Sequence, residues 1–107
     1  MDLVVLDECL PRKLAKLLAP HHTRTVPEIG LAGFTNGTLL RALSGQCRAF
    51  ITIDSNLSYQ QNLPALPFAS ILLAAPSNRL TDLEPLVPAI IGALSHAEPG
   101  AIVRIPS

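Results

Sequence analysis

Short apolar runs recur along the chain at intervals that suit an alternation of strands and helices. Leu3–Leu6, Ala49–Ile53 and Ala69–Ala74 lack a regular alternation of polar and apolar positions. This pattern is typical of strands that are buried on both faces of a parallel sheet. Thr23–Val26 and Ala101–Ile105 have weaker patterns of the same kind, and they predict two further short strands.

Segments with helical periodicity lie between these strands. Pro11 suits the first position of a helix, Asn36 is a favourable N-cap, and Pro88 should kink or break any helix that contains it. Pro27–Thr35, which contains two glycines, is expected to be a loop. The expected helical segments are Leu10–Ala19, Asn36–Gly45, Ser55–Asn62 and Asn78–Leu94.

This order of elements predicts the fold class. Strands that alternate with helices favour an α/β protein, in which helices cover both faces of a parallel sheet. We therefore expect a three-layer α/β/α sandwich with a mostly parallel central sheet of four to five strands. The 107 residues contain no linker or repeat, so we expect one domain over residues 1–107.

Composition and charge exclude several classes of function. Eight Lys and Arg balance eight Asp and Glu, so no overall charge draws the chain to nucleic acid or to anionic lipid. A nucleic-acid partner would need a local basic patch or metal ions. The apolar runs are shorter than the roughly 18 residues that span a bilayer, and the first residues lack a signal-peptide pattern. We therefore expect a cytoplasmic protein with no membrane segment and with two reduced thiols, Cys9 and Cys47.

Acidic residues follow two of the predicted strands. Asp7 and Glu8 come directly after the first strand, and Asp54 directly follows Ala49–Ile53. Ligand sites of parallel sheets lie at the carboxyl ends of the strands, near the point where strand order reverses. If the two strands are neighbours, the carboxylates converge and repel one another unless a divalent cation lies between them. The pattern therefore indicates a site for a hard cation such as Mg²⁺.

Other interpretations of these polar residues remain open. Asp54 is placed to cap the helix that follows it, and Asn36 is placed to cap its own helix. Glu8 fits either a supporting position at the site or a solvated surface. Asp7 lies too far before Pro11 to cap that helix, so its carboxylate needs another partner.

Three segments, taken together and in order, resemble the short bacterial PIN-like proteins. Their pattern runs LDENLP, then GL.G..[DN]..LL, then T.D.[DN]L. The matching segments here are Leu6–Pro11, Gly30–Leu40 and Ile51–Leu57, and Tyr59–Leu63 and Ser77–Leu80 resemble a longer subgroup of that family. The resemblance covers almost the whole chain. It implies a PIN-like fold related to the toxin ribonucleases of toxin–antitoxin pairs, with Mg²⁺ or Mn²⁺ as cofactor and an RNA phosphodiester as substrate.

The resemblance also implies roles for individual residues. Asp7 and Asp54 match the acidic metal ligands, and Thr52 matches the residue that orients the acidic cluster. Asn36 and Asn56 stand where many relatives carry Asp, so two neutral amides replace two anionic ligands. Fewer carboxylates lower the affinity for a divalent cation.

If the site is catalytic, we expect metal-assisted hydrolysis of RNA, with Asp7, Asp54 and Glu8 as its catalytic residues. Asp7 and Glu8 are the candidates to accept the proton of the attacking water. The candidates for contacts with the substrate phosphates are Arg12, Lys13, Lys16 and Arg79. The basic helix face also fits a solvated exterior or a docking surface for an acidic antitoxin segment, and Arg79 also fits an ordinary surface position at a helix start.

Two other functions compete with the nuclease. The first is a PIN-like protein-interaction module that binds an antitoxin-like partner, which the neutral Asn36 and Asn56 favour. The second is a receiver-like phosphoacceptor domain, which needs a Lys at the end of its last strand, where this chain offers Arg104. A small domain with this much apolar sequence is also expected to expose apolar surface, which suggests a homodimer or another partner.

Overall fold

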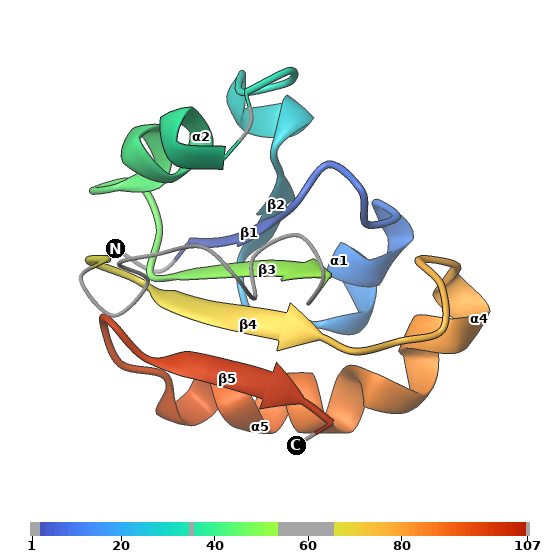
Figure 1. Cartoon of the computed structure of the whole chain (residues 1–107). Coiled ribbons are helices and arrows are strands. Elements are labelled where there is room, and N and C mark those ends of the chain that lie inside the picture. Colours follow the sequence, from blue (N-terminus) through green and yellow to red (C-terminus); the bar gives the residue numbers. More distant parts are fainter. Residues whose placement is uncertain (1–2, 35, 54–65, 107) are drawn as a thin grey trace.

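A parallel β-sheet forms the centre of the molecule (Figure 1). The structure is a computed structural model, and it describes residues 3–34, 36–53 and 66–106. Across the sheet of these residues, the five strands follow the order β2 (Thr23–Thr25), β1 (Val4–Leu6), β3 (Ala49–Ile53), β4 (Ala69–Leu73) and β5 (Ile102–Ile105). Every pairing between neighbours is parallel. The expected parallel sheet of four to five strands is confirmed.

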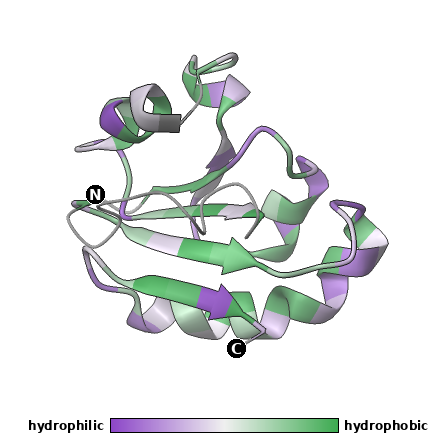
Figure 2. Cartoon of the chain, in the orientation of Figure 1, coloured by the Kyte–Doolittle hydropathy of each residue, from purple (hydrophilic) through white to green (hydrophobic). Residues whose placement is uncertain are grey.

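Helices cover the two faces of this sheet. Alternate strand residues point to opposite faces, so Ile51 packs toward α1 (Lys13–Leu17), α4 (Leu80–Leu83) and α5 (Val87–His96). On the other face Phe50 packs in the cluster that contains the buried side of α2 (Asn36–Leu43). Figure 2 shows the apolar colouring of the central strands between these helices. The arrangement is that of an α/β protein and is compatible with the expected sandwich.

Two connections in this sheet have opposite hands. The step from β1 to β2 runs toward one edge of the sheet, and the step from β4 to β5 runs toward the other edge. Their helices, α1 in the first and α4 with α5 in the second, nevertheless pack on the same face. Because about 98% of such crossovers are right-handed, one left-handed crossover is an uncommon feature. It places α1, α4 and α5 together on one side of the sheet.

The first helix begins later than the sequence predicts. The expected segment began at Leu10, whereas α1 begins at Lys13. The preceding residues form tight turns, in which Leu10 N–H donates to Asp7 O at 3.0 Å and Leu14 N–H donates to Pro11 O at 3.0 Å. These turns satisfy backbone groups that a longer helix would have used.

The expected long helix at Asn78–Leu94 is wrong as a single element. It consists of α4, a 3₁₀ turn η3 (Glu84–Leu86) and α5, and it begins at Leu80. Pro85 and Pro88 lie in the first turns of η3 and α5. A proline lacks the N–H that a helix interior needs but is tolerated in a first turn, so each proline starts a new segment, as expected for Pro88.

The remaining elements agree closely with the sequence. Asn36 is the first residue of α2, where the sequence predicted the position just before the helix. The expected loop at Pro27–Thr35 contains a 3₁₀ turn η1 (Pro27–Ile29), which ends at Gly30 with a φ of 82°. The expected helix Ser55–Asn62 lies outside the described residues. Among the helices that the structure describes, none has the length and apolar character to cross a membrane.

Candidate functional site

The carboxyl ends of β1 and β3 lie side by side. Leu6 pairs with Ile51, and the N–H of Asp7 continues this ladder with a bond of 2.9 Å to Ile51 O. Strand β1 is flanked by β2 on one side and by β3 on the other, so the chain reverses its direction of travel across the sheet here. Ligands of open parallel sheets bind at such a reversal point. Asp7 is therefore at the position where the topology favours a binding site.

Two donors hold the carboxylate of Asp7. The hydroxyl of Thr52, on β3, donates to Oδ2 at 2.5 Å, and the N–H of Glu8 donates to Oδ1 at 2.7 Å. Thr52 is completely buried, and Asp7 is half-buried. Hydrogen bonds to an ionised acceptor are among the strong ones in proteins. They fix the direction of this carboxylate, which is compatible with the orienting role that the resemblance implies for Thr52.

Cys9 lies behind the same site. Its Sγ is 4.0 Å from Oγ1 of Thr52, and its carbonyl oxygen accepts a bond of 2.8 Å from Nδ2 of Asn78. Burial, and after it the negative charge of Asp7, raise the pKa of the Cys9 thiol above its ordinary value. The thiol is therefore protonated at neutral pH. The Asn78 contact ties the loop after β4 to the loop after β1.

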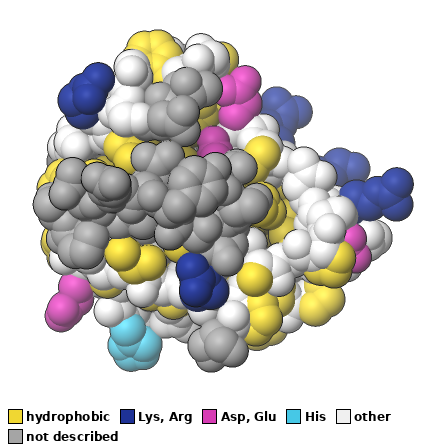
Figure 3. Space-filling model, viewed as in Figure 1, with side chains coloured by type: hydrophobic (Ala, Val, Ile, Leu, Met, Phe, Trp, Pro, Cys, Tyr) yellow, Lys and Arg dark blue, Asp and Glu magenta, His cyan; other side chains and the backbone are white. Residues whose placement is uncertain are grey.

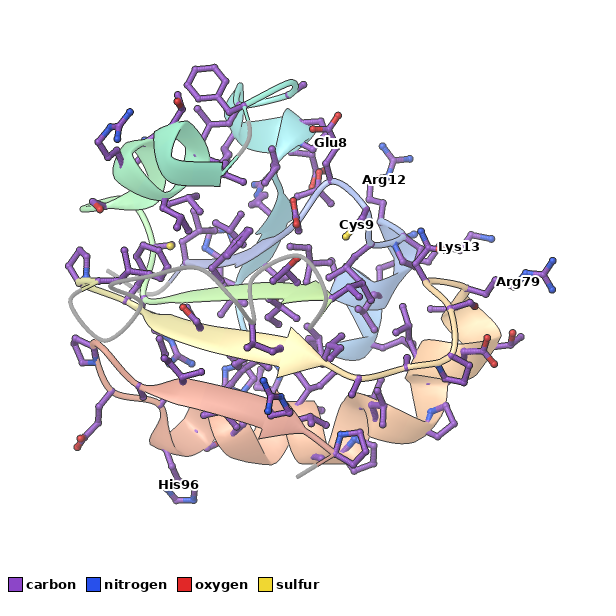
Figure 4. The ribbon with its side chains drawn as sticks, viewed as in Figure 1. Glu8, Cys9, Arg12, Lys13, Arg79 and His96 are labelled. Atoms are coloured by element: carbon purple, nitrogen blue, oxygen red, sulfur yellow. The ribbon has the colours of Figure 1, made fainter. Side chains whose placement is uncertain are left out.

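Glu8 points toward the loop before α2. Its Oε1 accepts a hydrogen bond of 3.1 Å from the N–H of Gly33. Gly33 has a φ of 86°, a left-handed conformation that glycine adopts without strain. The side chain of Glu8 is exposed and lies beside η1 in Figure 4. It is thus held at the rim of the site through the loop after β2.

A hollow of about 350 Å³ adjoins Glu8. Part of its wall is a reciprocal pair, in which Thr25 N–H donates to Oε1 of Glu28 at 2.9 Å and Glu28 N–H donates to Oγ1 of Thr25 at 3.3 Å. The bond from Thr25 N–H lowers the pKa of Glu28, with smaller contributions from Arg24 and Arg12. Glu28 is therefore ionised at neutral pH. The lining residues are Glu8, Leu10, Arg12, Thr25, Pro27 and Glu28.

The four cations proposed for substrate contact, Arg12, Lys13, Lys16 and Arg79, are all exposed. Three of them, Arg12, Lys13 and Arg79, project from the side of the molecule where β1 and β4 end (Figure 4). Lys and Arg side chains gather on this side in the space-filling view (Figure 3). Arg79 is the N-cap residue of α4, which has only four residues. The start of that helix is already occupied, because Ser77 Oγ donates to Asp82 at 2.5 Å and accepts from Arg79 N–H at 3.0 Å. The N–H of Arg79 is therefore engaged within the turn, and the phosphate contact predicted for Arg79 stays a prediction for its exposed side chain.

Several predicted site residues fall outside what the structure describes. Asp54 and Asn56 are not among the described residues, and neither is the side chain of Asn36. The convergence of Asp7 with Asp54 therefore stays a prediction. Within residues 3–34, 36–53 and 66–106, no group of three His, Cys, Asp or Glu could hold a metal ion. Mg²⁺ needs less, because one or two carboxylates with waters and substrate phosphates suffice, and ligating carboxylates are commonly hydrogen-bonded in turn. Asp7 fits that requirement.

Sequence reasoning missed some contributors to this region. Thr25 and Glu28 follow the T-x-x-E spacing of a capping box, with Pro27 between them, and this signal was available in the sequence. The contacts of Gly33 with Glu8 and of Asn78 with Cys9 join segments that are remote in the chain. No local pattern reveals such contacts.

Comparisons with protein-family models, curated proteins and solved structures find no match for this chain.

Proposed function

We propose that the chain is a metal-dependent ribonuclease of the PIN-like type, acting in the cytoplasm as the toxin of a toxin–antitoxin pair. One observation supports this most directly: Thr52 and the Glu8 N–H orient the carboxylate of Asp7 at the reversal point of a parallel sheet. Asp54 follows β3, the strand next to β1. The sequence therefore has a second carboxylate directly after the strand that neighbours β1.

The proposed cofactor is Mg²⁺ or Mn²⁺. Asp7 and Asp54 are its ligands in this proposal, and the side-chain oxygens of Asn36 and Asn56 are further candidates. When bound, the cation supplies a Lewis acid that polarises a phosphoryl oxygen and assists the attack of water. A site with two carboxylates suits a cation that keeps several waters and completes its coordination with substrate phosphate.

The other residues bind, orient or accept a proton. Thr52 holds Asp7 in one orientation through a fully buried hydroxyl. Glu8, exposed at the rim, accepts the proton of the attacking water. Lys13, Lys16 and Arg79 contact phosphates of the RNA, because they are exposed cations. Contacts to phosphates do not depend on which base the nucleotide carries.

The direct test is cleavage of a mixed RNA substrate with Mg²⁺ or Mn²⁺. We expect cleavage by the unaltered chain and none by Asp7→Asn or Asp54→Asn, since each removes an anionic ligand and keeps the side-chain shape. Asp82→Asn is the matched control, because Asp82 bonds Ser77 at the start of α4 and takes no part in the site. Absence of cleavage by the unaltered chain, or cleavage that survives in Asp7→Asn, contradicts the proposal.

A second candidate function is docking of an acidic antitoxin-like segment on α1. Leu17 is 39% exposed on this helix, next in sequence to the exposed Lys16 and four residues after the exposed Lys13. An exposed leucine beside two lysines suits a partner that is both acidic and apolar. Saturable binding of such a peptide, lost in Leu17→Asp, supports this function whether or not RNA is cleaved.

The receiver-like alternative loses support. Its essential lysine has no counterpart, since the two lysines of the chain are Lys13 and Lys16, and β5 carries Arg104. The possible homodimer stays a prediction. The large hydrophobic side chains that the described surface exposes, Leu17, Phe34 and Ile102, come from three separate segments and do not by themselves mark an interface. Light scattering after size exclusion, at high concentration, decides between monomer and dimer.

A further inference from the structure

The hollow beside Glu8 has further lining residues that the proposed hydrolysis does not use. It lies between the loop after β1, which contributes Glu8, Leu10 and Arg12, and the end of β2 with η1, which contributes Thr25, Pro27 and Glu28. Leu10 and Thr25 are buried, so they form the floor, whereas the charged residues are exposed at the rim. A volume of about 350 Å³ is at the small end of ligand sites in proteins and suits one ring system.

The rim selects against a phosphate group. Glu8 and Glu28 are two carboxylates, and ionised carboxylates only accept hydrogen bonds. Among the described lining residues Arg12 is the one cation, and it only donates. An occupant must therefore donate on one edge and accept on another, and it must offer an apolar face to Leu10 and Pro27. A nucleobase has this combination.

Among the bases, guanine fits the rim best. Its Watson–Crick edge carries adjacent N1–H and N2–H donors, and its other edge carries the O6 and N7 acceptors that arginine binds with two hydrogen bonds. Adenine, cytosine and uracil have no two adjacent donor atoms on this edge, so a carboxylate that bonds their single donor group also faces an acceptor. The planar guanidinium group of an arginine can also stack on an unstacked base of single-stranded RNA.

We propose that this hollow binds a guanine base of single-stranded RNA, next to the phosphate that is cleaved. The identity of the ligand as RNA rests on the proposed nuclease function. The position follows from the structure, because the N–H of Glu8 bonds Oδ1 of Asp7 at 2.7 Å while the side chain of Glu8 lines the hollow. One residue thus belongs to the proposed metal site and to the base site at once. Cleavage is then preferred beside guanosine.

The test measures binding without cleavage. Labelled uridine hexamers carrying guanosine, inosine or adenosine at one central position are titrated with the full chain in EDTA, and anisotropy gives each affinity. Inosine is the sharpest probe, because it differs from guanosine only in lacking the N2 amino group. We expect the guanosine hexamer to bind about tenfold more tightly than the other two, as one good bidentate contact to a base commonly allows.

A pair of matched variants locates the contact. Glu28→Gln keeps the reciprocal pair with Thr25, since Gln also serves in a capping box, but it replaces one acceptor oxygen by a donor. We expect it to abolish the preference for guanosine. Glu98→Gln makes the same change of charge at an exposed position before β5, and we expect the preference to survive. The amides of Thr25 and Gly33 should shift in NMR spectra on binding, because both donate to rim carboxylates.

The outcomes separate this inference from the nuclease proposal. Equal affinity for all hexamers, or no binding, overturns the guanine site, as does a guanosine preference that survives in Glu28→Gln. Cleavage of RNA with no preference for guanosine leaves the nuclease standing and removes the base site. A guanosine preference in EDTA, together with no metal-dependent cleavage, supports the base site and contradicts the nuclease proposal.

Discussion

Thr52 and Asp7 are joined across two neighbouring strands by a hydrogen bond of 2.5 Å from Oγ1 to Oδ2. The donor is fully buried at the end of β3, and the acceptor follows β1. A buried hydroxyl has little freedom to move, so the bond fixes one oxygen of the carboxylate. The proposed metal-dependent hydrolysis depends on that fixed carboxylate.

Replacing Thr52 by Val removes the hydroxyl and keeps the branched shape. We expect the variant to lose about 2 kcal/mol of unfolding free energy, because a hydrogen bond to a charged group is lost. We also expect Mn²⁺ affinity to fall about 10- to 100-fold, as it does when the partner of a metal ligand is removed. Urea denaturation and calorimetry measure the two effects. Thr52→Ser keeps the hydroxyl, so an equal loss of Mn²⁺ affinity in Thr52→Ser speaks against the orienting role.

Lys13 and Arg79 should contribute to RNA binding through salt-dependent contacts. Each phosphate contact with a single strand contributes about 0.7 to the slope of log affinity against log salt. We therefore expect Lys13→Ala and Arg79→Ala each to reduce the slope by about 0.7 for a uridine hexamer. Arg41→Ala, in the last turn of α2, is the control and should leave the slope unchanged. Identical slopes in all four proteins exclude these contacts.

Glu28 should make stability depend on acid pH. The hydrogen bond from Thr25 N–H lowers its pKa below the ordinary 4.5, so the folded state favours the ionised form. This contribution is present above the ordinary pKa and disappears as pH falls through the lowered pKa. Urea denaturation of the unaltered chain and of Glu28→Gln should therefore show a difference at neutral pH that shrinks below pH 4.5. If the difference in unfolding free energy between the two proteins is the same at neutral and at acid pH, the hydrogen bond from Thr25 N–H does not stabilise the ionised form of Glu28.

The two thiols should react slowly in the folded chain. Burial raises the pKa of Cys47 to about 12, and burial together with Asp7 raises the pKa of Cys9. Iodoacetamide attacks the thiolate, so alkylation at pH 8 should be much slower than in urea. Mass spectrometry should also show Cys9 reacting before Cys47, since Cys9 is half-buried and Cys47 is only 3% exposed. Equal rates in the folded and unfolded chain contradict this.

The sequence was informative where a local pattern decides the structure. The buried aliphatic runs predicted β1, β3 and β4 within one residue, because a strand covered on both faces needs continuous apolar residues. Pro88 correctly predicted a break in the helical segment. Pro11 wrongly predicted the start of the first helix, because the turns before α1 use the backbone groups that a helix would need. Local sequence patterns therefore predicted which segments form strands and helices better than they predicted the residues at which helices begin.

The site depended on contacts that no local pattern encodes. That Asp7 and Glu8 lie at the end of a strand follows from the sequence, whereas the neighbourhood of Asp7 and Thr52 requires the order of strands. The common face of α1 and α5 requires the hand of a crossover, which periodicity does not specify. The hollow between Glu8 and Glu28 exists only because two loops meet after folding.

Paramagnetic relaxation by Mn²⁺ tests the central claim most directly. Mn²⁺ bound at Asp7 broadens the NMR signals of nearby nuclei, so sub-millimolar Mn²⁺ should erase the amide signals of Asp7, Glu8 and Thr52. The amides of Gly45 and Gly100, in the turns that precede β3 and β5, should remain sharp. Asp7→Asn should retain all of these signals. Uniform broadening, or selective broadening that persists in Asp7→Asn, would contradict a metal site at the junction of β1 and β3.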